Sequence, residues 1–362
     1  MLKIGLKIQV DMSQILVDSD LQSLLDSKLL VINNLDAKNI QPSSIDIPIT
    51  GKKIHKMPYS SSFWNQNIDD VIKKHGQTIQ LKDSGTHLAK GQTYIVEVGK
   101  VNLPQHIALE ASPKSSAGRI NLGARLIADK SGKFDHVNPN TQAKLYLEIT
   151  PKNFSVIMRP GDAINQIIAR DYRIKSEVDI EQFPLFKNAN DPKLIAGNGK
   201  PFREKNQYFV HINIPEGLAA YKAKNIDFTI DLSKKNHYNP NDFFWEIHGV
   251  DGKLLLEKDG FYLMCTQEIL NVPPELSVIM NVFSEFVGDI RTQSAGYFDP
   301  GFYGSGVFEF SVWENMMIRH RQPICVMSAY ANSSIPQATY GAKDNSYLGQ
   351  QKIRLAKYFV QP

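Results

Sequence analysis

Short apolar runs, broken by glycine, proline and asparagine, follow one another along the chain from Leu88 onwards. Three of these runs extend from Val101 to Ala111, from Phe134 to Glu148 and from Phe154 to Tyr172. Arg159-Pro160-Gly161, inside the last run, has the composition of a tight turn between two strands. This succession of short strands and turns predicts a mainly β protein, folded as a sandwich, a barrel or a roll.

The N-terminal part of the chain has a helical period instead. Residues 13–32 have leucines at the spacing of one helix face, at positions 21, 24, 25 and 29. Asp18 or Ser19 is a suitable residue to cap this helix. We therefore expect a helix in this range, one of a few short helices in a mainly β chain.

The remaining segments are assigned by their turn residues. Residues 40–49 (IQPSSIDIPI) predict an extended segment at a sheet edge, because each proline removes a hydrogen-bond donor. Residues 50–85 are polar and predict loops, with Phe63-Trp64 as a local anchor. Residues 173–207 are charged and rich in turn residues, so they predict a connector, ordered in part around residues 183–186 (FPLF).

The second half of the chain repeats the first. An ungapped alignment that starts with Gly91 on Gly260 superimposes further identical residues: Asn102 on Asn271, Pro104 on Pro273 and Ser115 on Ser284. After a small length change, Phe134-Asp135 aligns with Phe298-Asp299, and residues 145–149 (LYLEI) align with residues 306–310 (GVFEF). A repeat this long predicts two domains, over residues 1–175 and 208–362, with a connector at 176–207.

Composition agrees with a soluble globular protein of two domains. The 362 residues are 42% hydrophobic and 22% charged. The net charge of +4 is too small to favour a nucleic-acid or membrane partner, no run has the apolar length of a membrane span, and no signal peptide is recognisable, so we expect a cytoplasmic location. Cys265 and Cys325 are expected to be reduced core residues, with one disulfide between them as the alternative.

The stretch from Ala111 to Arg119 (ASPKSSAGR) has the composition of an anion-binding loop. Ser115 and Ser116 lie between two cations, Lys114 and Arg119, and small residues let the backbone come close. Hydroxyls, backbone N–H groups and cations all bind anions, and ligand groups often lie at the end of a strand. Serine, alanine and glycine are equally common in ordinary loops, so the stretch alone leaves both interpretations open.

Several motifs, in this order, resemble the superfamily of dCTP deaminases and dUTPases. Residues 40–47 (IQPSSIDI), after an N-terminal helix, resemble the opening of dCTP deaminases, and residues 114–119 (KSSAGR) resemble an Arg-Ser-Ser-x-x-Arg motif with lysine first. Residues 296–302 (GYFDPGF) resemble the turn that closes over the sugar and pyrimidine. Residues 347–351 (YLGQQ) resemble the tail over the triphosphate, with Ser346 where the family has lysine; Lys343 or Lys352 can substitute.

The two halves diverge in a complementary way. In the second half, Phe283, Ser284, Glu285 and Gly288 occupy the places of the KSSAGR motif. In the first half, residues 134–137 (FDHV) align with the Asp-Pro-Gly turn, and the glutamine tail has no counterpart. We therefore expect a composite site with one wall from each half, contributed by one chain or by two.

The resemblance is strongest to the long, tandem-duplicated dCTP deaminases, and it implies fold and function. It implies two tandem dUTPase-like β-roll or β-barrel (β-clip) domains. It also implies a homo-oligomer. The implied reaction converts dCTP to dUTP and ammonia, in the biosynthesis of dUMP and dTTP precursors. The implied partners are the nucleotide, with Mg²⁺ bound through its triphosphate, and dTTP as a feedback inhibitor, without nucleic acid or membrane.

The resemblance also implies a role for each motif residue. Ser115 and Arg119 would position the attacking water and the developing amine, and Lys114 and Ser116 would face the phosphates. Other matched residues would bind the nucleoside and close over the triphosphate. These are Asp299 on the 3′-hydroxyl, Tyr297 or Phe302 on the sugar, and Tyr347, Gln350 and Gln351 over the phosphates.

Deamination of cytosine needs a group that takes a proton from water and returns it to the ring and the leaving ammonia. Most cytidine deaminases use zinc, but this sequence has no Cys-x-x-Cys motif, so we expect no zinc. In the resembling family the group is a strand glutamate, which Glu309 (VFEF) and Glu148 (YLEI) both match. Either can instead be an ordinary paired acid, and Glu309 is favoured because it shares a half with the turn and the tail.

Two other functions stay open at the level of sequence. The chain can be a dUTPase, or a bifunctional dCTP deaminase and dUTP diphosphatase. The superfamily also includes hydrolases, in which a carboxylate activates water for attack on the α-phosphate. It can also be a non-catalytic nucleotide-binding regulator, because its motifs are partly degenerate. Product analysis distinguishes the three: dUTP, dUMP with pyrophosphate, or binding without turnover.

Overall fold

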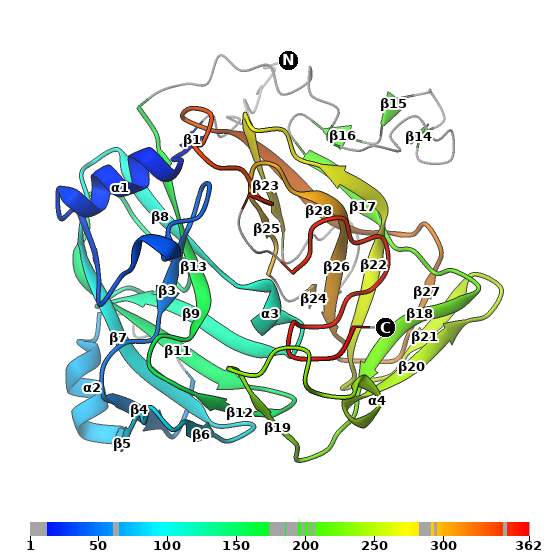
Figure 1. The fold of residues 1–362 in the computed structure, drawn as a ribbon, viewed down its shortest axis with the longest axis horizontal. Coiled ribbons are helices and arrows are strands. Elements are labelled where there is room, and N and C mark those ends of the chain that lie inside the picture. Colours follow the sequence, from blue (N-terminus) through cyan, green and yellow to red (C-terminus); the bar gives the residue numbers. More distant parts are fainter. Residues whose placement is uncertain are drawn as a thin grey trace, which may run out of the picture.

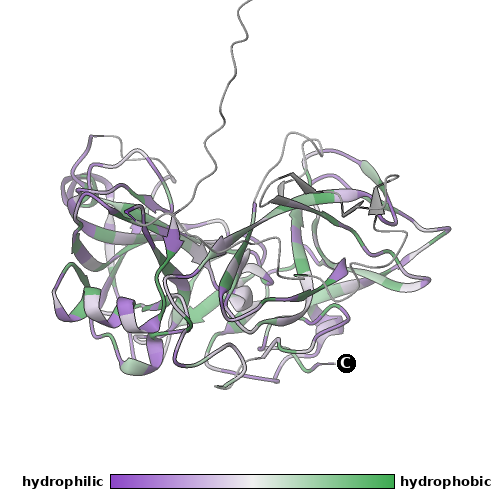
Figure 2. Ribbon diagram, turned by 90° about the horizontal axis from the view of Figure 1, so that it is seen from above, coloured by the Kyte–Doolittle hydropathy of each residue, from purple (hydrophilic) through white to green (hydrophobic). Residues whose placement is uncertain are grey.

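The computed structural model describes residues 13–60, 65–173, 185, 195–196, 200–201, 203–204, 207–281, 291–292, 295–342 and 346–361. The chain is mainly β, as predicted. Figure 1 shows two β-rich lobes, with the first half of the chain on the left and the second half on the right. Figure 2 shows the same two lobes from above, with hydrophobic stretches along the strands of each.

The first half contains two main sheets. The first sheet is made of β1 (Gln14–Ile15), β3 (Ile45–Pro48), β8 (Ile107–Pro113), β10 (His136–Val137) and β13 (Ala163–Asp171). The second sheet is made of β2 (Leu30–Ile32), β4 (Lys53–Met57), β5 (Gln77–Gln80), β7 (Thr93–Asn102), β9 (Leu122–Ala128) and β11 (Gln142–Pro151). The connections include α1 (Asp18–Asp26), η1 (Ala37–Asn39), α2 (Ile68–His75) and α3 (Ser115–Gly118).

The second half has a matching pair of sheets. One is made of β16 (Arg203–Glu204), β17 (Gln207–His211), β23 (Leu276–Met280), β25 (Tyr297–Phe298) and β28 (Pro323–Ala331). The other is made of β18 (Gly217–Ala223), β20 (Phe244–Gly249), β22 (Phe261–Asn271), β24 (Arg291–Thr292) and β26 (Tyr303–Ser311), with α4 (Pro240–Phe243) beside it. Two short hairpins add β14 (Ile195–Ala196) with β15 (Lys200–Pro201), and β21 (Lys253–Leu256) with β27 (Met316–Arg319).

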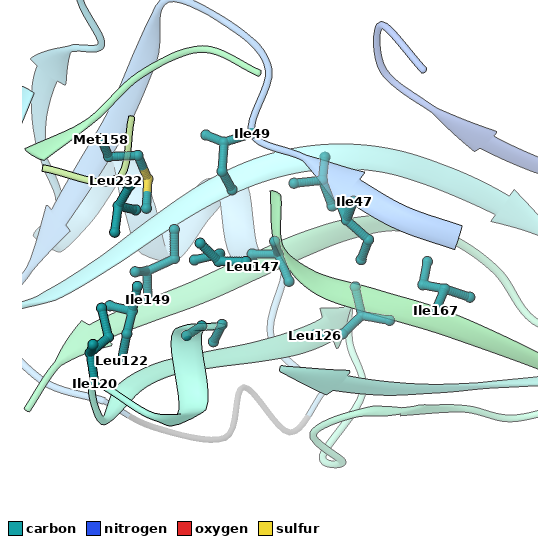
Figure 3. Close-up of a cluster of buried hydrophobic side chains, with 14 of the residues drawn as sticks. Ile47, Ile49, Ile120, Leu122, Leu126, Leu147, Ile149, Met158, Ile167 and Leu232 are labelled. Atoms are coloured by element: carbon teal, nitrogen blue, oxygen red, sulfur yellow. The ribbon is translucent and has the colours of Figure 1, made fainter. Parts of the chain in front are cut away.

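A layer of branched aliphatic side chains forms the core of the first half. Figure 3 shows part of this layer, in which Ile47 of β3, Leu126 of β9 and Leu147 of β11 are almost completely buried. These three residues come from both main sheets, so the sheets pack face to face over them. Burial of such side chains contributes about 1.5–3 kcal/mol each, which makes the core the main source of stability.

The two halves are joined by strand pairing and by an ion pair at their interface. Strand β19 (Thr229–Asp231) of the second half pairs in parallel with β12 (Ser155–Met158) of the first, which also pairs with β6 (Thr86–Leu88). Arg159 and Asp231 form an ion pair across this joint. Leu355 and Phe359, near the C-terminus, are buried in a hydrophobic cluster that contains residues of both halves, and the Phe359 ring packs against those of Phe243 and Phe244. The joint therefore fixes how elements from both halves meet.

The helix α1 is shorter than the sequence period predicts. Ile15 pairs with β13 and residues 30–32 form β2, so sheet pairing outweighs the helical spacing at both ends of residues 13–32. The helix begins after Val17, and neither Asp18 nor Ser19 is its N-cap. The Asp18 carboxylate instead accepts a hydrogen bond from the backbone N–H of Gln337 (3.0 Å).

The prediction of loops over residues 50–85 was wrong. This range contains β4, α2 and β5, and Asn67 caps α2 by accepting from the backbone N–H of Asp70. The pattern of Ile68, Val71 and Ile72, all buried, was masked by the charged residues around it. Phe63-Trp64 lies outside the described residues.

Two other predicted segments agree with the structure where it describes them. Strand β3 is an edge strand that pairs with β13, and residues 159–161 form the turn between β12 and β13. Of the connector, the structure describes only short pieces, including buried Leu185; the rest of the predicted FPLF anchor lies outside the described residues.

Strand pairing supports the repeat but changes its alignment. Glu148 lies opposite Ile95 and Glu309 opposite Leu263, so the two glutamates are equivalent, as predicted. At the start of β7 and β22, however, the equivalent of Gly91 is Asp259, since both adopt a positive φ. The reason is a register shift inside β22, which contains one residue more than β7.

The predicted counterpart of the Asp-Pro-Gly turn was also wrong. Val137 of β10 pairs with Leu109, and Phe298 of β25 pairs with Val278, which occupies the place of Leu109 in the repeat. Residues 137–141 (VNPNT), not Phe134-Asp135, therefore match residues 298–302 (FDPGF). The first half keeps a turn there but has asparagine in place of the Asp299 carboxylate.

Candidate active site

A cavity of about 210 Å³ is lined by residues of both halves, including α3 and the C-terminal segment (residues 346–361). The first half contributes Gln41, Asp46, Lys114, Ser115, Ser116, Arg119 and Gln166. The second half contributes Ala295, Tyr297, Phe298, Asp299, Phe302, Val307, Glu309, Tyr340, Ser346, Tyr347, Gln350 and Lys357. A larger groove of about 1010 Å³, beside β2, β7 and β11, has no carboxylate or hydroxyl in its lining, so the smaller cavity is the candidate site.

The KSSAGR motif forms α3 and its two flanking residues. Lys114 precedes the helix and makes an ion pair with Asp46, while Ser115 opens the helix and lines the cavity. The hydroxyl of Ser116 lies 2.9 Å from that of Tyr347. Arg119 follows the helix with only 4% of its surface exposed. One turn of chain thus places two cations and two hydroxyls around the cavity.

Arg119 is held by the C-terminal segment of the second half. Its Nη1 donates hydrogen bonds to Oε1 of Gln350 (3.2 Å) and to the carbonyl oxygen of Arg354 (2.6 Å). Its guanidinium lies 3.9 Å from the centre of the Tyr347 ring, at the distance of a cation–π contact. These contacts fix the planar guanidinium and leave its Nε buried without a hydrogen-bond partner.

Glu309 of β26 lies directly against α3. Its side chain is 2% exposed, and one oxygen accepts a hydrogen bond from the backbone N–H of Ala295 (3.2 Å). A Cβ on Gly118 would lie 2.2 Å from Oε2 of Glu309, so only glycine leaves room for this carboxylate. Desolvation raises the pKa of Glu309 to about 8, although the Ala295 hydrogen bond and the charge of Arg119 oppose the shift.

Asp299 is held by the Ser-Ser pair of the IQPSSIDI motif. Its Oδ1 accepts hydrogen bonds from the backbone N–H (3.3 Å) and the hydroxyl (3.2 Å) of Ser43, and from the hydroxyl of Ser44 (3.5 Å). Burial, with a smaller contribution from the charge of Asp46, raises the pKa of Asp299 to about 6. The hydroxyl of Tyr297 donates to Oγ of Ser43 (2.7 Å). An N-terminal motif therefore positions the turn of the second half.

The tail residues divide between the cavity and the surface. Tyr347 and Gln350 line the cavity, and Nε2 of Gln350 is anchored on the carbonyl oxygen of Ser305. Gln351 is exposed and is not part of the lining, so the structure does not bring it to the site as predicted. Phe302 lines the cavity with its ring between those of Phe298 and Tyr340.

Glu148 is buried elsewhere, away from the residues of the cavity. It accepts a hydrogen bond from the hydroxyl of Ser60 (2.6 Å) and lies opposite Arg125 of β9 in the sheet. It does not line the cavity, whereas the equivalent Glu309 does. Of the two glutamates that the sequence left as alternatives, only Glu309 therefore lies with the KSSAGR motif, the Asp299 turn and the tail.

Sequence reasoning missed several polar residues of the cavity. Gln41 and Asp46 belong to the IQPSSIDI motif, which was recognised but given no role in the site. Gln166, which accepts from the Ser44 hydroxyl (3.1 Å), and Lys357 had no motif at all. The sequence did contain one signal for Gln41 and Asp46, which is the polar composition of the IQPSSIDI motif. An edge strand with a purely structural role does not require two serines and an aspartate.

Among the residues that the structure describes, no group of three or more histidine, cysteine, aspartate or glutamate side chains is arranged to hold a metal ion. Cys265 and Cys325 are separate, buried free thiols. Within the same residues, the helices are all too short or too polar to span a bilayer.

Comparison with known proteins defines the family. The model for the N-terminal domain of 2′-deoxycytidine 5′-triphosphate deaminase matches residues 12–173, and the model for its C-terminal domain matches residues 187–359. Together they span most of the chain, and the gap between them, residues 174–186, overlaps only the start of the predicted connector. The chain therefore belongs to the 2′-deoxycytidine 5′-triphosphate deaminase family.

Individual relatives are similar over shares of this chain that range from 42% to 90%. A dCTP deaminase, dUMP-forming, from Methanosphaera stadtmanae is 27% identical over 206 residues, which are 55% of this chain and 98% of the relative. A protein of the same name from Coprothermobacter proteolyticus is 27% identical over 42% of this chain and 80% of its own length. The crystal structure of the 2′-deoxycytidine 5′-triphosphate deaminase from Agrobacterium tumefaciens superimposes with a TM-score of 0.77 at 26% identity, over 90% of this chain and all of that one.

Proposed function

We propose that this protein deaminates dCTP to dUTP and ammonia, with Glu309 as the group that moves protons. The observation that supports this most directly is the position of the Glu309 carboxylate, buried against α3 in a cavity that also contains Ser115 and Arg119. Family membership supports the substrate. The absence of a Cys-x-x-Cys motif from the sequence supports a reaction without zinc.

Glu309 has the environment that such a proton shuttle needs. An ionised Glu309 would take a proton from water as the oxygen attacks C4 of cytosine, and would donate that proton to N3. The carboxylate would then take the second proton from the new hydroxyl on C4 and donate it to the amine, which leaves as ammonia when the C4–N bond breaks. A pKa near 8, caused by desolvation, allows both protonation states near neutral pH. Arg119 and Ser115 would hydrogen-bond the water and the amine, as proposed from the sequence.

The other cavity residues would bind the rest of the nucleotide. Asp299, held by Ser43 and Ser44, would accept the 3′-hydroxyl, and Phe302 would pack on the sugar. Ser116, Tyr347 and Gln350, which also line the cavity, would contact the triphosphate. Because Lys114 is paired with Asp46, its contribution to phosphate binding would require that this pair loosens or binds as a unit.

Mg²⁺ would be held mainly by the triphosphate. The described residues contain no protein cage for a metal, but Asp46 lines the cavity and its Oδ1 is buried without a hydrogen-bond partner. A hard carboxylate oxygen of this kind fits a cation that keeps most of its ligands from phosphate and water. When bound, Mg²⁺ would neutralise phosphate charge.

Homo-oligomerisation, dTTP inhibition and a cytoplasmic location stay predictions.

A second candidate product is dUMP. The curated relatives are named dUMP-forming, and the cavity contains two further carboxylates, Asp46 and Asp299, beside Glu309. A second carboxylate is what hydrolysis at the α-phosphate would need to activate water. This bifunctional activity is therefore the alternative to simple deamination.

Incubation of the purified protein with dCTP and Mg²⁺, followed by separation of the nucleotides, tests the proposal. We expect dUTP and ammonia, formed equally well in the presence of a zinc-selective chelator. Production of dUMP and pyrophosphate would support the bifunctional alternative, and activity that Zn²⁺ alone restores after chelation would contradict the zinc-free mechanism. Binding of dCTP without turnover would instead support a regulator.

A further inference from the structure

Lys357 is a cation of the cavity for which the sequence motifs give no role. It lies in the C-terminal segment, and its backbone N–H donates a hydrogen bond to the hydroxyl of Tyr347 (3.2 Å). The same hydroxyl lies 2.9 Å from Oγ of Ser116. One tyrosine hydroxyl thus ties the segment of Lys357 to the KSSAGR motif.

The ammonium group of Lys357 differs from the other two cations of the cavity. Lys114 is paired with Asp46, and Arg119 is bonded to Gln350 and Arg354. In the part of the chain that the structure describes, no hydrogen bond or ion pair reaches Nζ of Lys357, which lies 5.7 Å from the centre of the Tyr358 ring.

A partly buried ammonium without a counter-ion is unfavourable, and it becomes favourable when an anion enters. Desolvation, and then the positive charge of Lys114, lower the pKa of Lys357. The carboxylates of Asp162 and Asp46 oppose this shift without outweighing it, and neither forms an ion pair with Nζ in the described residues, so a negative charge in direct contact is lacking. A triphosphate in the cavity would supply that charge and would be the natural partner of Nζ.

The position of Lys357 also answers a gap in the tail motif. Ser346, where the resembling family has lysine, lines the same cavity but offers only a short neutral hydroxyl. Of the two substitutes suggested by the sequence, Lys352 is exposed and outside the cavity lining, and Lys343 lies outside the described residues. Lys357 is therefore the tail cation that the geometry favours.

We propose that Lys357 binds the triphosphate, in place of the lysine that is missing at position 346. The proposal rests on the proposed function for the identity of the nucleotide, but it requires only that the cavity binds a polyphosphate. It predicts that Lys357 discriminates nucleotides by their phosphate chain and contributes little to recognition of the base and sugar.

Calorimetric titration of three variants, Lys357→Met, Lys357→Arg and Lys352→Met, with dCTP, deoxycytidine and inorganic tripolyphosphate tests this role. Loss of a charge-assisted hydrogen bond should weaken dCTP and tripolyphosphate binding by about 10- to 100-fold in Lys357→Met. Lys357→Arg should recover most of this affinity, and Lys352→Met should bind like the wild type. Affinity for deoxycytidine should be equal in all four proteins.

Unchanged dCTP affinity in Lys357→Met, or an equal loss in Lys352→Met, would overturn the proposal, as would a wild-type protein that binds neither polyphosphate. Thermal melting of each variant identifies a folding defect, in which case Lys357→Gln repeats the titration. Failure of the proposed function is a separate result: a protein without turnover that still binds dCTP through Lys357 would refute the reaction and support this inference.

Discussion

Glu309 combines burial with a carboxylate that has one backbone hydrogen bond and no described salt bridge. Its equivalent in the repeat, Glu148, is also buried but accepts from Ser60 in a different part of the protein. Desolvation raises the pKa of Glu309 to about 8, whereas its ordinary value is 4.5. The difference between the two glutamates is therefore one of surroundings, since the strand pairing places them at the same point of the repeat.

The raised pKa of Glu309 predicts a pH dependence of catalysis. In the proposed mechanism the ionised carboxylate takes the proton from water, so kcat/KM for dCTP should rise with pH and reach half its maximum near pH 8. Glu309→Gln should reduce the rate by about 10²- to 10⁴-fold. Glu148→Gln is the matched control and should keep the wild-type profile. An active Glu309→Gln enzyme beside an inactive Glu148→Gln enzyme would move the site into the first half.

The same raised pKa predicts a pH dependence of stability. A carboxyl group whose pKa is higher in the folded state binds its proton more tightly when folded, so its stabilising contribution is complete below about pH 4.5 and is lost as the pH rises to about 8. Urea denaturation of the wild type and of Glu309→Gln should show the wild type losing stability relative to the variant across this window. A difference that does not vary with pH would show that Glu309 titrates normally.

The Asp299 turn predicts a choice of sugar. Asp299 is fixed by Ser43 and Ser44, and Phe302 is fixed between two other rings, so neither side chain can move easily to admit a 2′-hydroxyl. We expect kcat/KM for dCTP to exceed that for CTP by about 10²-fold. Phe302→Leu should narrow this ratio. Similar kcat/KM values for dCTP and CTP in the wild-type enzyme would refute this role of the turn.

At the scale of elements, α3 determines where the Glu309 carboxylate can lie. The helix touches the carboxylate through Gly118, at a distance that excludes a Cβ atom. The obstructing atoms are at the end of a flexible side chain, so an alanine would displace the carboxylate more readily than it would disrupt the backbone. The contact is thus a constraint on the position of the Glu309 carboxylate rather than on the fold.

We therefore predict that Gly118→Ala reduces kcat by about 10²-fold, the cost of misplacing a reacting group by about 1 Å, with little change in Tm. The matched control is Gly123→Ala in β9, where a Cβ would lie 3.2 Å from the carbonyl oxygen of Thr150 and does not reach the cavity. That variant should have near-normal kcat and a slightly lower Tm. Equal activity of the two variants would show that Gly118 is ordinary helix packing.

Much of the fold and the site was predictable from short, local patterns. The strand-and-turn rhythm, the repeat and the KSSAGR and Asp-Pro-Gly motifs each depend on neighbouring residues, and most of the motif residues line one cavity. The strand register was not predictable, because one additional residue within β22 shifts the alignment by one position. Lys357 was missed because its role depends on a fold that returns the C-terminus to α3, which no local pattern encodes.

At the scale of the whole molecule, the site belongs to both halves of one chain. Arg119 comes from the first half and Glu309 from the second, and both line one cavity within a single chain. The second half lacks the KSSAGR cations in its sequence, and the first half has Asn138 in place of Asp299. The cavity therefore has one wall from each half of one chain, which is the arrangement that the composite hypothesis expects.

Mixing two inactive variants tests this arrangement most directly. Arg119→Ala and Glu309→Ala should each be inactive, and a cooperative melting transition shows that each variant is folded. The two proteins are denatured together, refolded and assayed with dCTP, with wild-type protein treated in the same way as the positive control. Because both walls of the site come from one chain, the mixture should be no more active than the separate variants. Recovery of activity in the mixture would contradict the account, since it would place Arg119 and Glu309 of one site on different chains.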